Sequence, residues 1–147
     1  MREILKAMQN KFNDSTSQRP DGQRPIDAPL VKFNLQVSLA QIRNEQAYKD
    51  RDRNAITLFK SANLRHVLIS LHAGAEMKTH QTEGMVSLQV LDGDIDFKLG
   101  ELSLNMLSGE VIVIHEEVPH GLTANKETAL LLTMTSSESQ YRTNPNL

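Results

Sequence analysis

The chain has 147 residues and a formal net charge of −2, which suits one domain whose core needs no disulfide or metal to fold. Aromatic residues make up only 4% and basic and acidic residues nearly balance at 16 and 18, which argues against a nucleic-acid surface. The absence of Cys excludes disulfides, thiolate metal sites and a cysteine nucleophile, and no apolar run approaches the length of a membrane span.

The cellular compartment is suggested by the same features. A chain without Cys fits a reducing environment, and the first residues carry charge but no apolar segment of a secretory signal. We therefore expect a cytoplasmic protein that contacts neither a membrane nor a nucleic acid.

The N-terminal zone, residues 1–26, is polar and is interrupted by Pro20 and Pro25. Proline pushes the residue before it toward an extended conformation, so no long helix is expected there. The spacing of apolar residues predicts only a short helix over 3–9. We expect 1–26 to form a flexible arm that is either free or docked on a partner.

Residues 27–53 form a second zone, which we interpret as a strand and helix extension. The sequence predicts a short strand over 29–34. Ser38 is the expected N-cap of a helix over 38–48, in which apolar residues recur at helical spacing.

From residue 54 onward, short alternating segments predict an all-β domain over 54–136, followed by a polar tail over 137–147. Asp92-Gly93 is a strong signal for a two-residue hairpin between two of these segments. Many short strands with turns at spacings near ten residues are typical of an antiparallel sandwich or barrel. The expected strands cover 56–60, 65–71, 86–91, 94–98, 102–106, 111–114, 122–124 and 129–134.

Two motifs stand out within this domain. The first contains Gly74, His80 and Gly93, and the second is the segment Gly109–His120, in which a hydrophobic strand leads to Pro-His. Together and in this order, they resemble the two motifs of a cupin. The resemblance covers about 55–136. It implies a double-stranded β-helix, that is, a jelly-roll cupin barrel, here with an N-terminal arm and one short helix.

The resemblance also implies a metal site, but this chain departs from the pattern. Metal-binding cupins take two His and a Glu from the first motif and one His from the second. The second His position is Thr82 here and the Glu position is Val86, neither of which is a good ligand. Only His80 and His120 remain to hold a divalent transition metal such as Zn, Ni, Fe or Mn.

Two interpretations of this His pair stay open. The imidazoles can form a site at the barrel mouth that binds a metal or an organic ligand, or they can be inert remnants held by hydrogen bonds. A metal centre needs one more carboxylate, and Glu76 and Glu83 are nearest in sequence. Glu76 shares strand parity with His80.

The expected ligand pocket is apolar with few polar groups. Arg65 alternates with the core-facing Val67, so its guanidinium either anchors a ligand carboxylate or extends to solvent at the strand end. By parity His66 and His72 face outward, and His115 lies on an exposed loop. The residues expected to line the pocket are Val86, Leu88, Val90, Leu122 and Leu132.

Three functions compete at this stage. The first is a small-molecule-binding cupin with its site at His80 and His120, and the alternative is a metal-dependent cupin enzyme resembling a dioxygenase or an isomerase. The third is an interaction protein that works through its arm or through the strand at 29–34. We also expect a homodimer, because an outward apolar strip invites a partner. That strip consists of Leu68, Leu91 and Leu131.

Overall fold

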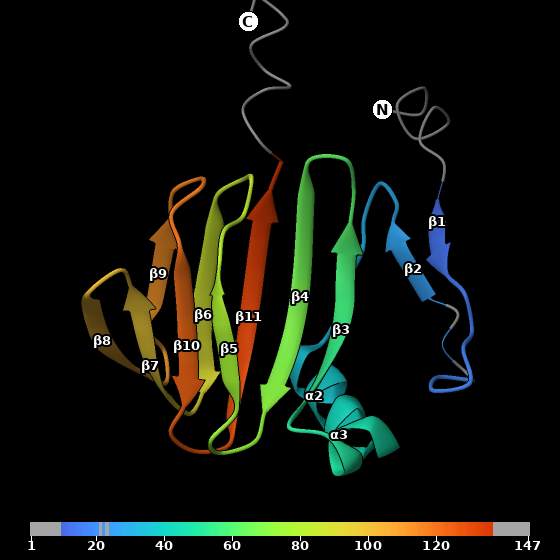
Figure 1. Ribbon diagram of the computed structural model, residues 1–147. Helices are drawn as coiled ribbons and strands as arrows, with labels where there is room; N and C mark the ends of the chain where they lie inside the picture. The colour runs from blue at the N-terminus through green and yellow to red at the C-terminus, as the bar shows by residue number, and fades with distance from the viewer. Residues whose placement is uncertain (1–9, 21, 23, 137–147) are drawn as a thin grey trace, which may run out of the picture.

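Figure 1 shows the computed structural model of the chain, which describes residues 10–20, 22 and 24–136. The helix expected over 3–9 and the tail over 137–147 lie outside these residues. Within the described residues, no helix is long and apolar enough to cross a membrane.

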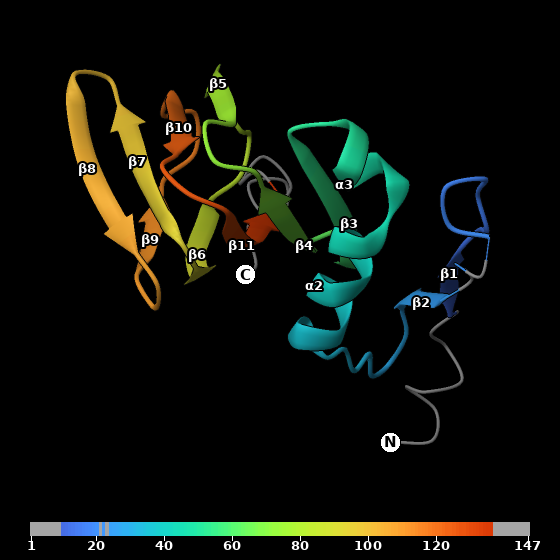
Figure 2. The ribbon, with the colours of Figure 1, turned by 90° about the horizontal axis from the view of Figure 1, so that it is seen from below.

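Two antiparallel sheets face each other and form a β-sandwich (Figures 1 and 2), which confirms the predicted all-β fold. The five-stranded sheet has, in spatial order, β3 (Arg53–Lys60), β4 (Leu64–Leu71), β11 (Thr128–Thr135), β6 (Val86–Asp92) and β9 (Val111–Ile114). The four-stranded sheet has β5 (Glu76–His80), β10 (His120–Ala124), β7 (Asp94–Leu99) and β8 (Leu102–Leu107).

The main core lies between the sheets and follows the alternation of the sequence. On β6, Val86, Leu88 and Val90 are buried, while the residues between them face outward and are partly exposed. Gly93 makes the hairpin to β7 with φ of 135°, and a Cβ there would lie 2.7 Å or less from three atoms of Thr128. A larger residue at this turn would therefore be both strained and crowded.

A second core lies on the outer face of the five-stranded sheet, under helix α2 (Leu35–Asn44) (Figure 2). Ile42 of this helix is fully buried against Leu68 and its neighbours, and Leu91 and Leu131 are partly buried beside them. The expected apolar strip of Leu68, Leu91 and Leu131 is therefore not free for a partner, because the chain's own helix covers it. A short helix, α3 (Gln46–Asp50), follows α2.

Two expectations for the extension are wrong. Asn34, not Ser38, caps α2, and its side chain accepts a hydrogen bond from the Val37 amide at 3.1 Å. Residues 29–34 form no strand, and Leu30 is 85% exposed. An extended segment becomes a strand only when it pairs with another, and this one pairs with no described strand.

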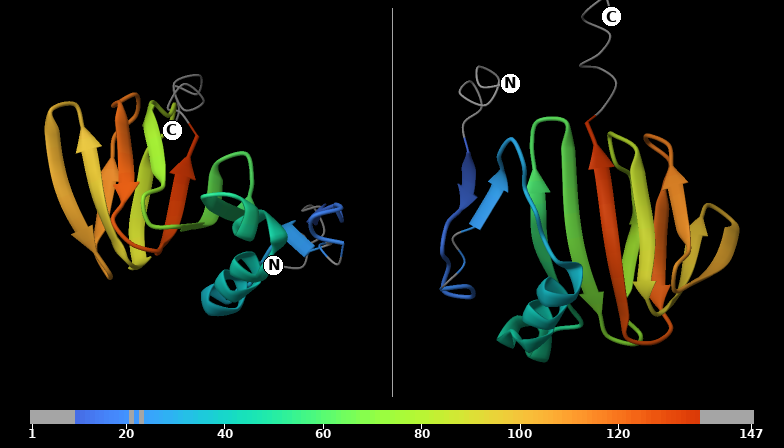
Figure 3. Two further views of the ribbon diagram at one scale, coloured as in Figure 1. Left: turned by 60° about the horizontal axis from the view of Figure 1, so that its bottom comes forward. Right: turned by 180° about the vertical axis from the view of Figure 1, so that it is seen from behind.

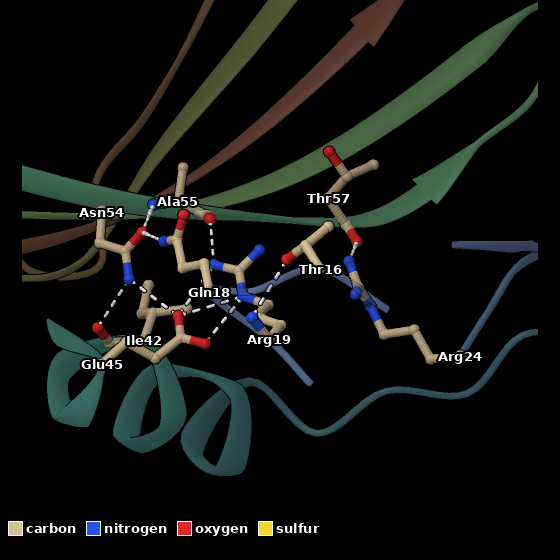
Figure 4. Close-up of polar contacts among 9 residues, drawn as sticks. All are labelled: Thr16, Gln18, Arg19, Arg24, Ile42, Glu45, Asn54, Ala55 and Thr57. Carbon is tan, nitrogen blue, oxygen red and sulfur yellow. Dashed lines mark hydrogen bonds and ion pairs between the residues drawn. The ribbon is translucent and has the colours of Figure 1, made fainter. Parts of the chain in front are cut away.

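The described part of the N-terminal arm forms a hairpin of β1 (Lys11–Asn13) and β2 (Arg24–Asp27), which lies beyond β3 in Figure 3. The connection between the two strands packs against the rest of the chain through Arg19. The Arg19 guanidinium forms an ion pair with Glu45 at 2.9 Å and donates to the carbonyl of Ala55 at 2.5 Å (Figure 4). Arg24 donates to the carbonyl of Thr57.

Candidate functional site

His80 and His120 lie side by side on neighbouring strands β5 and β10. They are cross-strand partners, and their ring centroids are 4.5 Å apart with the planes tilted by 59°. His120 is only 6% exposed, whereas His80 is exposed to solvent. The pair therefore has one buried member and one at the surface, and its role as a metal site stays a prediction.

Both imidazoles make the same local hydrogen bond. His80 Nδ1 lies 3.0 Å from the carbonyl oxygen of Lys78, and His120 Nδ1 lies 2.8 Å from that of Val118. A carbonyl oxygen only accepts, so we assign the proton to Nδ1 in both rings. Each Nε2 then carries a lone pair, which is the form that binds a metal or accepts a hydrogen bond from a ligand.

A β-bulge in β5 sets the position of His80. His120 pairs with His80 but Leu122 pairs with Met77, so two residues of β5 oppose the single residue Gly121. A Cβ on Gly121 would lie 2.9 Å from the Met77 carbonyl oxygen, so glycine is needed for this close approach. The bulge turns Met77 to the same side as His80, although strict alternation places it on the opposite face.

The space beside the two imidazoles is small. It is a cavity of about 30 Å³, enough for one or two water molecules but far below the size of a ligand pocket. Val90, also expected in the lining, is fully buried in the core instead. The residues that line the cavity with the two His include Met77, Thr82, Val86, Leu88, Leu122 and Leu132.

A larger apolar cleft lies next to this cavity. It has a volume of about 290 Å³, and Ile114 lines both this cleft and the small cavity. The ring of Phe97, which lines the cleft, is nearly parallel to the His120 ring, at a centroid distance of 6.0 Å. Apart from His115, every residue of the lining is apolar: Phe97, Leu99, Leu104, Ile112, Val113, Ile114 and Val118.

The sequence does not predict this cleft. Alternation indicates that Phe97 and Ile112 face inward, but it carries no information on where the two sheets separate. The structure shows that they leave a gap at the end formed by β7, β8 and β9.

Arg65 lies outside both spaces. It is exposed and lines a separate polar hollow of about 370 Å³, together with Glu83 and the turn between β3 and β4. The hollow shares Thr82 and Met134 with the small cavity. Arg65 is therefore near the His pair but does not line the same cavity.

A third metal donor is missing among the residues described. Thr82 Oγ1 donates to the carbonyl of Gly84 at 3.1 Å, Glu76 is exposed on β5, and Glu83 lines the polar hollow. In residues 10–20, 22 and 24–136, no three His, Asp or Glu side chains come together as a metal site. Two imidazoles do not fit a resident metal that needs three or four protein ligands.

The other His side chains have structural surroundings. His72 stacks on Tyr48 at a centroid distance of 3.9 Å, and His66 packs near Phe33 and Phe59. Both face the outer side of the sheet as predicted, but the N-terminal extension packs against them. His115 is exposed, as expected, at the edge of the apolar cleft.

Neither a protein-family model nor a curated protein matches the chain. The fold is similar to that of an RmlC-like cupin from Desulfovibrio desulfuricans, with 27% identity, a TM-score of 0.54, and coverage of 58% of this chain and 84% of the other. A cupin superfamily protein from Desulfitobacterium hafniense aligns at 13% identity and a TM-score of 0.57, covering 58% of this chain and 78% of that one.

A third similar structure is a variant of salicylate 1,2-dioxygenase from Pseudoaminobacter salicylatoxidans in complex with gentisate. It aligns at 17% identity and a TM-score of 0.62, over 82% of this chain but only 35% of the dioxygenase. At these identities, the similarities establish a shared fold and leave the chemistry to the residues of the site.

Proposed function

Because the chain carries a cupin-type domain, we propose that it binds a small organic molecule, with His80 and His120 as polar anchors and the apolar cleft as the chamber for its body. The observation that carries this proposal is the imidazole pair with both Nδ1 atoms bonded to main-chain carbonyls and both Nε2 atoms directed elsewhere.

The protonation of the pair specifies the polar end of the ligand. A neutral imidazole with its proton on Nδ1 accepts a hydrogen bond at Nε2. The ligand therefore presents a donor, such as an alcohol or phenol hydroxyl. His120 is nearly buried, so a hydroxyl bonded to it is shielded from competing water.

The cleft specifies the rest of the ligand. Its volume of about 290 Å³ lies at the lower end of small-molecule sites, which suits one or two rings or a short aliphatic body. The Phe97 ring, nearly parallel to that of His120, favours a flat aromatic ligand that stacks against it. The proposed ligand class is a small phenol or aromatic alcohol.

The alternative is a metal-dependent cupin enzyme. Its support is the same pair of Nε2 lone pairs and the similarity to a dioxygenase fold. The donor set argues against it, because two imidazoles without a carboxylate leave a divalent ion short of protein ligands. We therefore derive no catalytic step through a metal.

The first test is calorimetric titration with phenol and benzyl alcohol. Alkanes, which have no hydroxyl group, serve as comparison ligands. We expect the hydroxyl compounds to bind and His120→Ala to weaken binding about tenfold or more, since a hydrogen bond to a buried anchor contributes about 1–2 kcal/mol. Lys98→Ala, an exposed change on β7, is the matched control and should bind as the wild type does. Equal affinity of His120→Ala and wild type would contradict the proposal.

Metal titration separates the two candidate functions. Zn²⁺, Ni²⁺, Fe²⁺ and Mn²⁺ are titrated into wild type and His80→Ala, and we expect weak binding that His80→Ala abolishes. Tight one-to-one binding that survives dialysis would instead support the metal-dependent alternative.

A further inference from the structure

The two edges of the five-stranded sheet differ in how they are protected. At the β3 edge, Arg19 donates a hydrogen bond to the carbonyl of Ala55. Arg24 donates to the carbonyl of Thr57, which lies two residues after Ala55 on the same strand (Figure 4). Side chains thus occupy acceptors that another strand would need for pairing. This edge is closed to a further strand by the chain itself.

The opposite edge, β9, has no such protection. Within the described part of the chain, β6 is its only paired strand. Its four residues are β-branched and uncharged. Val111 and Val113, which alternate with the more buried Ile112 and Ile114, are 51% and 63% exposed, and Val113 also lines the rim of the apolar cleft. Exposed apolar edge strands are templates for pairing with another chain.

A neighbouring edge, β8, is less suited to this role. Figure 2 shows β8 and β9 at the same end of the sandwich, each as the last strand of its sheet. Between its exposed leucines, β8 presents the polar and exposed Ser103 and Asn105. Asn105 also donates to the carboxylates of Asp94 and Asp96 on β7, so two acidic groups lie beside this edge.

We propose that a second copy of this chain pairs antiparallel with β9 across a two-fold axis, which joins the two five-stranded sheets into one. This inference goes beyond ligand binding and does not depend on it. In a continuous sheet outward residues stay outward, so Val111 pairs with Val113 of the second copy. Ile112 then lies opposite its own equivalent at the axis.

The charges around β9 favour this register over the nearest one that keeps the same faces outward. The uncharged stretch Val111–Ile114 lies between Glu110 and Glu116. In the proposed register neither Glu faces an acid, whereas a shift that centres the axis on Val113 would place Glu110 opposite Glu116. A second β9 therefore matches this edge in length and in its uncharged β-branched residues, keeps the flanking Glu side chains apart, and buries apolar surface on the outer face through the paired valines.

The first test compares Val113→Lys with Val37→Lys by sedimentation velocity at micromolar concentration. Val37 is 65% exposed on α2, so it is a matched control on a different surface. We expect dimers for wild type and Val37→Lys. For Val113→Lys, we expect a dissociation constant raised about tenfold or more. Each Lys would replace an apolar contact with Val111 of the second copy, and the two ammonium groups would be diagonal neighbours about 7–8 Å apart. A wild type that sediments only as a monomer, or a Val113→Lys variant that dimerises fully, would overturn the proposal.

A disulfide between two copies tests the register, and this test remains valid even if Val113→Lys does not fold. The chain has no Cys, so Ile112→Cys introduces a single thiol. Opposed Cβ atoms in an antiparallel pair lie about 5 Å apart, close enough for a disulfide after small adjustments. We expect mild oxidation to link Ile112→Cys into a covalent dimer and to leave Val37→Cys monomeric on a denaturing gel. Equal crosslinking of the two variants, or none at position 112, would refute the register.

Discussion

At the scale of single residues, Glu45 joins the N-terminal segment to the sheet. Its carboxylate accepts from the Arg19 guanidinium and from Asn54 Nδ2, both at 2.9 Å, and its side chain is 12% exposed (Figure 4). Burial by itself raises the pKa of Glu45, but the hydrogen bonds from Arg19 and Asn54 together outweigh it and hold the pKa below its ordinary value. The charged form of Glu45 is thus the one that stabilises the fold.

The lowered pKa predicts how stability depends on pH. The unfolded chain binds a proton at Glu45 more readily than the folded chain, so the ionised group stabilises above its unfolded pKa. This contribution is lost as the pH falls through the folded pKa. We expect Glu45→Gln to be less stable than wild type at neutral pH and this difference to shrink as the pH falls below about 4.

Urea unfolding at a series of pH values measures this difference. Glu101→Gln is the control, because Glu101 is exposed and no ion pair to it occurs among the described residues. A stability difference between wild type and Glu45→Gln that is the same at every pH would contradict the assignment.

At the scale of elements, helix α2 is part of the core although it lies outside the sandwich. Ile42 is fully buried where the helix contacts β3 and β4. Truncating a buried Ile removes apolar contacts and leaves a cavity, so Ile42→Ala should lower the free energy of unfolding by about 2–5 kcal/mol. Val37→Ala, on the exposed side of the same helix, should change it by less than about 0.5 kcal/mol. Denaturant titration of both variants checks this, and equal effects would show that α2 does not support the sheet.

The strands of the sandwich could be predicted because apolar and polar residues alternate along each of them, which identifies the face that is buried. The alternation of Val86, Leu88 and Val90 is local, and Asp92-Gly93 fixes the next turn. The segment 29–34 has similar residues but lacks a pairing partner, and pairing is not a local property. Ser38 was a plausible cap, yet Asn34 starts the helix earlier and satisfies an amide that Ser38 would leave unpaired.

The site was predictable only in part for the same reason. The two motifs brought His80 and His120 to attention, and the structure places their rings 4.5 Å apart. The position of Met77 depends on a bulge, and the cleft beside Phe97 depends on the distance between two sheets. Both are set by tertiary packing, which no spacing along the chain encodes.

At the scale of the whole molecule, the proposed pairing at β9 would stop at two copies, because the other edge of the same sheet, β3, is covered by side chains. Two copies joined at β9 would both present a β3 edge covered by Arg19 and Arg24. If the arginine side chains no longer covered β3, each copy would have two sheet edges that can pair with another copy. A molecule with two such edges forms open-ended chains.

We therefore expect Arg19→Ala/Arg24→Ala to form larger assemblies over time, as followed by static light scattering at constant temperature. The control is Arg51→Ala/Arg65→Ala, which removes the same charge from exposed positions away from the β3 carbonyls. Identical scattering from the two double variants would mean that loss of positive charge, and not an uncovered edge, controls assembly.

The bulge in β5 links the length of one strand to the identity of a residue on another. Removing either of the two residues that oppose Gly121 would restore regular pairing and still leave the imidazole opposite His120. With the extra residue gone, the backbone of β5 would no longer crowd position 121, and side chains larger than glycine would fit there. Over evolution, a one-residue insertion in this strand and a glycine across from it should therefore be gained and lost together, so that the spacing of the first motif varies while the imidazole stays in place.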